Sequence, residues 1–217
     1  MKRFVVFLSG LFLVFSFVFA GCGGGNGDDW TELLTNGGFE TGDLTGWTYA
    51  PLPSAAGTIS VIDSDVAPLS GFSIAGPSEG TWYALADQDE NFAAVIFQDF
   101  TVPDGDEEVV LTFDMFVLNS VGNTAVDAGF IGYSGLEDNQ HVRVDVLPAT
   151  AGTFDTTDPD IDNVYRDVDG DTPILPYIPY EFELTLTAGE TYRLRFAESS
   201  NMGSMNMGVD NVSVRSR

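Results

Sequence analysis

Side chains that could carry out catalysis are scarce in this 217-residue chain, which contains one cysteine and one histidine. The histidine, His141, is predicted on the outward face of a strand, whereas a Ser-His-Asp triad needs it oriented beside a nucleophile. Ser134 lies in a Gly-Tyr-Ser-Gly-Leu sequence, which lacks the second glycine of a nucleophile elbow. A catalytic zinc site is not predicted either, because the chain lacks the histidine ligands that such a site uses. We therefore predict that the chain is not an enzyme. A paired-carboxylate glycosidase is a distant alternative, because carboxylates abound and no pair stands out.

Basic side chains at outward strand positions are the candidates for ligand binding. Arg143 and Asp145 alternate with valines, and Arg193 and Arg195 alternate with leucine and aromatic residues. Planar guanidinium groups suit recognition at fixed geometry, and these four residues could bind the hydroxyl groups of a sugar. The alternative is a set of cross-strand ion pairs that relieve the negative charge, each contributing about 0.2–1 kcal/mol.

A cluster of acidic residues between Asp158 and Asp171 resembles a calcium-binding loop in its alternating aspartates. Counted from Asp158, the sixth position should be glycine but is Asn163, and the twelfth is Asp169. The match is partial and no flanking helices are evident. We interpret this segment as a solvated loop, and a second calcium there stays an open alternative.

Strands must position these side chains, because period-two alternation dominates after residue 31 and no helical stretch is evident. Strands are predicted over residues 58–62, 81–86, 94–102, 109–118, 140–147, 182–186, 192–196 and 209–214. Turn-forming residues separate them, and the segment 149–179 is predicted as a long inserted loop. Alternation sends Trp82 and Tyr83 to opposite faces, so at most one of them can stack on a ligand. About eight to ten short strands predict an all-β chain, a single antiparallel sandwich or jelly roll over residues 31–217.

The N-terminus reads as an export signal. Met1-Lys2-Arg3 precedes an apolar run to Ala20, and small residues follow it. The sequence Phe19-Ala20-Gly21-Cys22 resembles the lipobox of bacterial lipoproteins, in which the cysteine thiol receives a diacylglyceryl group. The resemblance implies a signal peptide over residues 1–21, lipidation at Cys22 and a glycine-rich tether over residues 22–30. An uncleaved transmembrane anchor is the alternative. We expect a lipid-anchored protein of the cell envelope, at the outer membrane or cell surface.

Charge excludes one class of partner. The chain carries 8 Lys+Arg against 33 Asp+Glu, a formal net charge of −25. Lys2 and Arg3 lie in the signal segment, so the exported part is more acidic still and contains no lysine. A field of that sign repels phosphate backbones, so we predict no nucleic-acid partner. Contact with a membrane should come through the lipid anchor rather than through a basic surface.

Two end motifs carry a resemblance to a known fold group. The domain opens with residues 33–47, LLTNGGFETGDLTGW, and closes with residues 208–214, GVDNVSV. Together with residues 97–103 and 186–192, they resemble the jelly-roll modules of the galactose-binding-like group, which includes many carbohydrate-binding modules. The motifs belong to the scaffold, so the resemblance is specific for fold and poorly specific for function. Phe39 and Trp47 are expected in the core.

The same resemblance implies a structural calcium. In these modules the first and last strands are adjacent, and a Glu and an Asp at the positions of Glu40 and Asp210 hold calcium together with backbone carbonyls. Asp210 shares its strand parity with Val212 and Val214, so we expect it to point inward, where a lone carboxylate is costly unless paired or bound to a cation. Calcium favours such oxygen ligands. A shared hydrogen-bond network without metal is the alternative.

Two functional readings follow. The first is a cell-envelope lipoprotein that displays a non-catalytic binding module, with glycan as the expected ligand. The second is a structural or assembly protein of the envelope or extracellular matrix, with a protein partner. Exposed aromatic residues beside polar side chains would favour the first reading, and an exposed apolar patch would favour the second. The sequence does not identify the glycan, the partner, the membrane leaflet or the oligomeric state.

Overall fold

The computed structural model describes residues 30–88, 91–119, 126–133, 135, 137–157, 162–166 and 174–217. The predicted signal segment, Cys22 and nearly all of the tether lie outside these residues, as does most of the acidic segment from Asp158 to Asp171. Among the described residues no helix is long and apolar enough to span a membrane.

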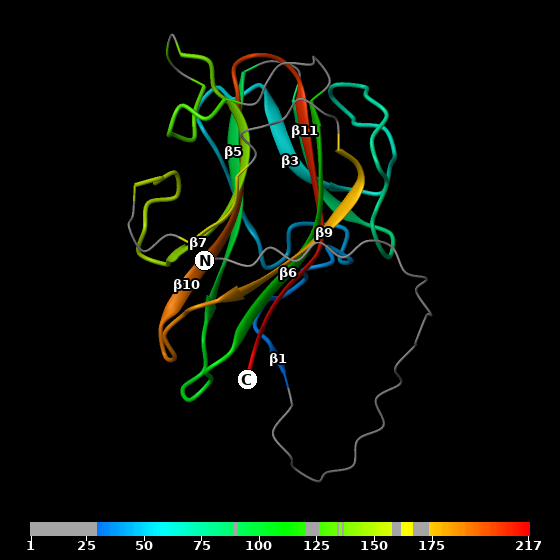
Figure 1. The fold of residues 1–217 in the computed structure, drawn as a ribbon. Coiled ribbons are helices and arrows are strands. Elements are labelled where there is room, and N and C mark those ends of the chain that lie inside the picture. The colour runs from blue at the N-terminus through cyan, green and yellow to red at the C-terminus, as the bar shows by residue number, and fades with distance from the viewer. Residues whose placement is uncertain are drawn as a thin grey trace.

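Two antiparallel sheets face each other (Figure 1). The strands are β1 (Thr31–Glu32), β2 (Thr48–Pro51), β3 (Gly57–Ile62), β4 (Tyr83–Gln88), β5 (Phe92–Thr101), β6 (Val109–Asn119), β7 (Gln140–Pro148), β8 (Asp162–Arg166), β9 (Ile174–Leu184), β10 (Thr191–Ser200) and β11 (Met205–Ser216). One sheet, the front sheet, has the order β3-β4-β11-β6-β9, with β1 paired to β11, and the other, the back sheet, has the order β2-β5-β10-β7-β8. This arrangement confirms the all-β sandwich predicted from the sequence.

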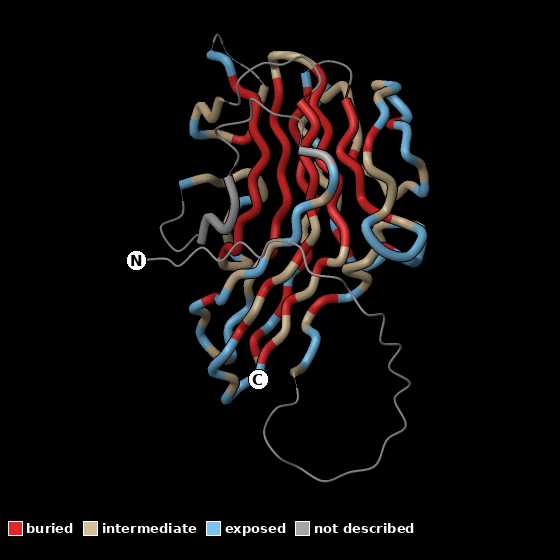
Figure 2. Tube along the Cα trace, turned by 45° about the vertical axis from the view of Figure 1, so that its right-hand side comes forward, coloured by how far each residue is buried: buried red, intermediate tan, exposed pale blue. Residues whose placement is uncertain are grey.

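The main core lies between the sheets and follows the predicted alternation. Val142, Val144 and Val146 on β7 pack into one cluster with Leu194 and Phe196 on β10. Phe39 and Trp47 lie in the same cluster, with their ring centroids 5.5 Å apart, as expected for core anchors. Strands buried along most of their length alternate with exposed loops and ends (Figure 2).

Loops cover the outer face of each sheet. Over the front sheet, Ala67 and Ile74 from the β3–β4 connection pack on Leu85 and Phe116. Asp87 on the same face accepts hydrogen bonds from the backbone of Leu69 and Ser70. Over the back sheet, Ile131 and Phe154 from the loops before and after β7 pack with a second apolar group, which comprises Ala93, Val95 and Ala197. Apolar residues on outer strand faces therefore have loop partners.

Two sequence-based expectations are wrong in detail. Strand β9 begins at Ile174, inside the segment predicted as a long loop, and pairs with β6 along the edge of the front sheet. The pairing of β11 with β6 shifts in register between Asp210 and Ser213, and Asn211 there has a positive φ of 51°. This irregularity breaks the strand parity, so Asp210 pairs with Asp114 and lies on the outer face, while Val212 and Val214 enter the core.

Candidate functional site

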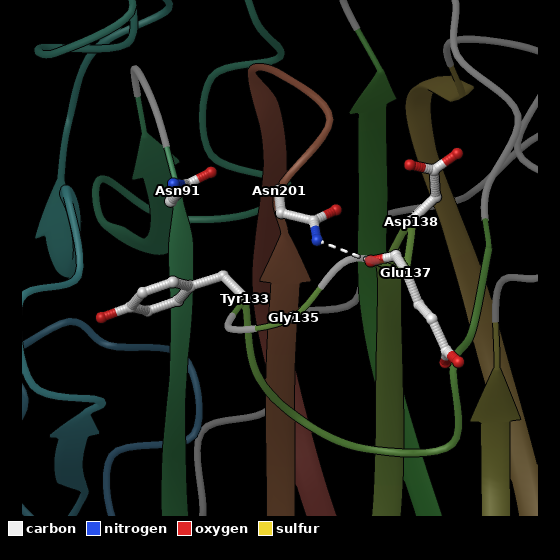
Figure 3. A pocket seen from close by; sticks show the side chains of 6 residues that line it. All are labelled: Asn91, Tyr133, Gly135, Glu137, Asp138 and Asn201. Carbon is white, nitrogen blue, oxygen red and sulfur yellow. Dashed lines mark hydrogen bonds between the residues drawn. The ribbon is translucent and has the colours of Figure 1, made fainter.

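A polar pocket opens at one end of the sandwich, where β5 begins, β10 ends and the loop before β7 crosses between them (Figure 3). We call it the end pocket. Its volume is about 340 Å³, and it is lined by Asn91, Tyr133, Gly135, Glu137, Asp138 and Asn201. Small-molecule sites occupy pockets of roughly this size or larger, in which a few polar groups fix the orientation of the ligand.

The loop that forms the end pocket is held by the buried amide of Asn139. Its Nδ2 donates to the carbonyl oxygens of Gly132 at 2.6 Å and Phe130 at 3.1 Å. Its Oδ1 accepts from the backbone of Ala128 and lies 2.9 Å from His141 Nδ1. Because every polar atom of this side chain is bonded, Asn139 fixes the loop without itself facing the pocket.

Asn201 joins the loop to the end of β10. Its side chain donates to the carbonyl oxygen of Glu137 at 2.8 Å and accepts from the backbone of Asn139, also at 2.8 Å. These bonds leave the exposed carboxylates of Glu137 and Asp138 directed to solvent on one side of the pocket (Figure 3). The pocket thus presents hydrogen-bond acceptors on a fixed loop.

Tyr133 provides the aromatic surface of the end pocket. Its ring packs with the apolar group on the outer face of β5, and its hydroxyl donates to the carbonyl oxygen of Pro53. The ring is half-buried and extends across β5, away from Asn201, Glu137 and Asp138, on the side of the pocket nearer Asn91 (Figure 3). A fixed aromatic ring next to amides and carboxylates can stack against the apolar face of a sugar while the polar groups bind its hydroxyls.

None of the pocket side chains is identifiable as a ligand contact from the sequence. They lie in turns, where polar residues are expected anyway. The available signal was Tyr133 between two glycines, Gly132 and Gly135, in a segment considered above only for its serine.

The four residues predicted for ligand binding lie on the expected outer face, but three of them are not accessible. Arg143, Asp145 and Arg195 are 1%, 0% and 0% exposed. Asp145 accepts from Arg143 Nη2 at 2.7 Å and from Arg195 Nη2 at 2.5 Å. Arg195 also donates to the carbonyl oxygens of Thr153 and Asp155. The expectation of exposed side chains is therefore wrong, because the loop after β7 covers them.

Arg193 lies on the same outer face, nearer the beginning of β10 than Arg195. It pairs with Asp99 on β5 at 2.7 Å, and its guanidinium lies 4.1 Å from the ring centre of Phe97. His141, also predicted outward, is buried beside Asn139 and lies 4.0 Å from Asp127. The pairs Arg193–Asp99 and Arg195–Asp145 join neighbouring strands, and such cross-strand ion pairs are the alternative to ligand binding.

Glu40 and Asp210, the carboxylates proposed for calcium, hold the same stretch of backbone. Glu40 Oε1 accepts from the backbone N–H groups of Thr81 and Trp82 at 2.8 and 3.0 Å. Asp210 Oδ2 accepts from those of Ser78 and Glu79. The backbone donors at Trp82 and Thr81 lower the pKa of Glu40. Burial raises the pKa of Asp210 to about 6, against the effect of its backbone donors.

The fit of these residues to calcium is partial. A second pocket borders Glu40 and is lined by Gly38, Glu79, Gly80 and Asn211, so its donors are oxygen-rich, as calcium prefers. Both oxygens of Asp210, however, already accept backbone N–H groups. Within the described part of the chain, no group of three or more acidic, histidine or cysteine side chains is arranged to hold a metal. The hydrogen-bond network weighed as the alternative is present, and calcium stays a prediction.

Comparison with known structures defines the class of fold: a β-sandwich of the type found in carbohydrate-binding modules. A carbohydrate-binding module of family 61, TmCBM61, solved with β-1,4-galactotriose, matches with a TM-score of 0.54 and 14% identity over 86% of this chain and 99% of that one. This confirms, for the fold, the resemblance noted in the end motifs.

Two further structures match over a similar part of the chain. The K3 cleaved adhesin domain of Lys-gingipain from Porphyromonas gingivalis W83 has a TM-score of 0.51 and 16% identity, covering 85% of this chain and 98% of that one. The enzymatically active domain of bacteriophage CBA120 tailspike protein 4 has a TM-score of 0.51 and 13% identity over 86% of this chain, but only 21% of that chain is covered. No family model matches the sequence, and neither does any curated protein.

Proposed function

We propose that the chain is a non-catalytic glycan-binding module of the cell envelope, held to the membrane by lipid at Cys22, and that the end pocket receives the glycan. The observation that carries the proposal is a polar pocket lined by Tyr133, Asn91 and two exposed carboxylates, on a loop fixed by Asn139. Similarity of fold to a module solved with β-1,4-galactotriose supports it.

The chemistry of the pocket selects the class of glycan. Glu137 and Asp138 lie in a chain of strongly negative net charge, so an anionic sugar would be repelled. Neutral or amino-bearing sugars offer hydroxyl or ammonium donors to these carboxylates. We therefore propose a neutral or amino-bearing glycan rather than a uronate or a sulfated polymer.

The test is a glycan array with the purified protein, followed by titration of any glycan that binds. We expect Tyr133→Ala to weaken binding at least tenfold, equivalent to about 1.4 kcal/mol. Asn91→Ala should also weaken binding. Arg193→Ala, on the same sheet face but outside the end pocket, is the matched control and should leave affinity unchanged. A glycan whose affinity depends on Arg193 and not on Tyr133 would contradict the placement of the site.

Absence of any bound glycan would transfer support to the second reading, a structural protein with a protein partner. The exposed large apolar side chains among the described residues are Val66, Leu69 and Ile178. Two of them belong to the loop over the front sheet, so that loop is where substitutions should be placed to test a protein partner.

A further inference from the structure

The only histidine of the chain, His141, lies at the base of the loop that forms the end pocket. We call residues 127–139 the pocket loop. Its base is closed by two backbone hydrogen bonds between Val126 and Gln140, of 2.8 and 2.7 Å, immediately before His141. His141 is 1% exposed, and its imidazole lies beside two side chains of the pocket loop. A change in the charge of this ring would therefore act directly on the pocket loop.

The hydrogen bonds of Asn139 fix which nitrogen of the imidazole carries a hydrogen. Asn139 Nδ2 donates to two carbonyl oxygens, so its Oδ1 is the atom that accepts from the backbone of Ala128 and lies 2.9 Å from His141 Nδ1. Because an amide oxygen only accepts, His141 Nδ1 must be the donor. In the neutral ring, the other nitrogen, Nε2, then carries a lone pair and can only accept.

That second nitrogen faces a carboxylate. His141 Nε2 lies 4.0 Å from Asp127 Oδ1, and the two side chains are 1% and 3% exposed. With a neutral ring both of these atoms are acceptors. With a second proton on the ring, Nε2 becomes a donor and a positive charge faces the carboxylate. Asp127 Oδ1 also accepts from the backbone N–H of Gly129 at 2.6 Å, so this ion pair would hold the beginning of the pocket loop against β7.

The strands around His141 bring one charged side chain to its face of the sheet. Along β7 this is Arg143, two residues further on, which is bound to Asp145 through three hydrogen bonds. On β10 the residue paired with His141 is the uncharged Ser199, and the next residue, Glu198, points to the opposite face. The described pairing of β8 with β7 reaches only to Arg143.

The segments before β7 contribute one carboxylate to this surrounding. Residues 120–125, which connect β6 to the pocket loop, contain no charged residue. In the pocket loop itself, Glu137 and Asp138 are exposed at the end pocket, whereas the side chain of Asp127 is buried against His141. Asp127 is therefore the group that favours a protonated ring, and Arg143 opposes it.

We propose that His141 and Asp127 form a proton-binding pair that controls how firmly the pocket loop is held, so that the end pocket binds its ligand more tightly at mildly acidic than at mildly alkaline pH. Histidine is the side chain whose ordinary pKa, about 6.5, places its change of charge between pH 5 and 8. When His141 is protonated, the ion pair holds the pocket loop at Asp127. When it loses the proton, that attachment is lost. The effect on binding rests on the proposed function of the end pocket, and the effect on the pocket loop does not.

The first experiment follows the imidazole by NMR from pH 5 to 8 in protein without a polyhistidine tag, in which His141 gives the only imidazole signals. We expect the ring to titrate, with the neutral form carrying its hydrogen on Nδ1. Asp127→Asn keeps an acceptor for Gly129 and removes the charge, and it should lower the titration midpoint by about one pH unit. Asp43→Asn is the matched control and should leave the midpoint unchanged. Asp43 Oδ1 also accepts from a backbone N–H two residues further on, but in the connection between β1 and β2.

The second experiment measures hydrogen exchange at the backbone amides of Ala128 and Gly132, which are bonded to the side chains of Asn139 and Ser199. Exchange itself becomes faster as pH rises, so the wild type is compared with His141→Asn at each pH. This variant keeps a donor near the position of Nδ1 and cannot titrate. The protection of these amides in the wild type, relative to the variant, should fall about threefold between pH 5.5 and 8.

Three results would each overturn the proposal: a ring that does not titrate between pH 5 and 8, a midpoint that Asp127→Asn leaves unchanged, or a relative protection that stays constant with pH. If all three measurements are as expected and no glycan binds, the pair is supported and only the proposed ligand fails. If a glycan binds, the wild type should bind it about threefold more tightly at pH 5.5 than at pH 8, and His141→Asn should show no such change. A wild-type affinity that is constant with pH would overturn the link between the pair and the end pocket.

Discussion

Asp145 is the side chain whose charge the fold should depend on most. Its carboxylate lies between Arg143 and Arg195, all three are at most 1% exposed, and five hydrogen bonds from the two guanidinium groups converge on its two oxygens. Burial lowers the pKa of Arg195, and the charge of Asp145 opposes that effect. Asp145→Asn keeps the shape of the side chain but leaves two guanidinium groups buried with less negative charge.

Breaking a buried ion pair by removing one partner costs about 3–5 kcal/mol. For a domain of this size each kilocalorie lowers the melting temperature by about 2–4 °C, so Asp145→Asn should melt about 6–20 °C below the wild type. The loop after β7 should also become more sensitive to protease, because Arg195 holds it through the carbonyl oxygens of Thr153 and Asp155. Urea unfolding and limited proteolysis measure the two effects.

The chain supplies its own control for this prediction. Asp99 pairs with Arg193 on the same face of the same sheet, with similar bond lengths of 2.7 and 3.0 Å, but the Asp99 side chain is 40% exposed. Asp99→Asn should therefore cost at most about 1 kcal/mol. If the two substitutions cost the same, burial does not govern the strength of these pairs and the reasoning fails.

Three further predictions follow from single positions. Because the pKa of Asp210 is raised to about 6 in the fold from an ordinary 3.8, its contribution to stability is fully present below pH 3.8 and is lost as pH rises to about 6; Asp210→Asn should flatten that part of the pH profile in chemical denaturation. A methyl group on Gly208 would overlap the ring of Phe116, so Gly208→Ala should cost about 1–3 kcal/mol, whereas Gly76→Ala, with open space around it, should cost little; equal costs in urea would contradict this. Cys22→Ser should abolish lipidation, and an intact mass showing no lipid on Cys22 in the wild type would refute the anchor.

Alternation was sufficient to predict most strands and the core. The set Val142, Val144 and Val146 is buried as predicted, because period-two patterns report which face of a strand is apolar. Alternation failed at Asp210, where the irregular pairing with β6 reverses the parity of the residues that follow. An added residue of this kind leaves little trace in the pattern, although the asparagine at 211 is a residue type that tolerates positive φ.

The sequence-based prediction also missed the loops that cover the outer faces of the sheets, and this was its larger omission. Arg143 and Arg195 point away from the core between the sheets and are nevertheless buried. The reason is that a loop covers the outer face of their sheet. The sequence carried a signal for this: Ala93, Val95 and Ala197 also lie on the outer face and are apolar. A strand that is apolar on both faces needs a partner on both, and Ile131 and Phe154 in otherwise polar segments are those partners.

The arginine side chains of this chain make contacts within the fold, and this limits their availability for binding a ligand. Beyond the signal segment the only basic residues are six arginines, and side chains are described for five of them. Arg143 and Arg195 are held by Asp145, and Arg193 by Asp99. The remaining two, Arg215 and Arg217, lie over the ring of Trp30.

Every arginine with a described side chain is thus engaged within the fold, and none of them lines the end pocket. Strong recognition of phosphate, sulfate or carboxylate groups in proteins relies on such cations. If the end pocket binds a glycan as we propose, recognition would use a ring, amides and carboxylates, which suit a ligand that is rich in hydroxyl donors and carries no negative charge.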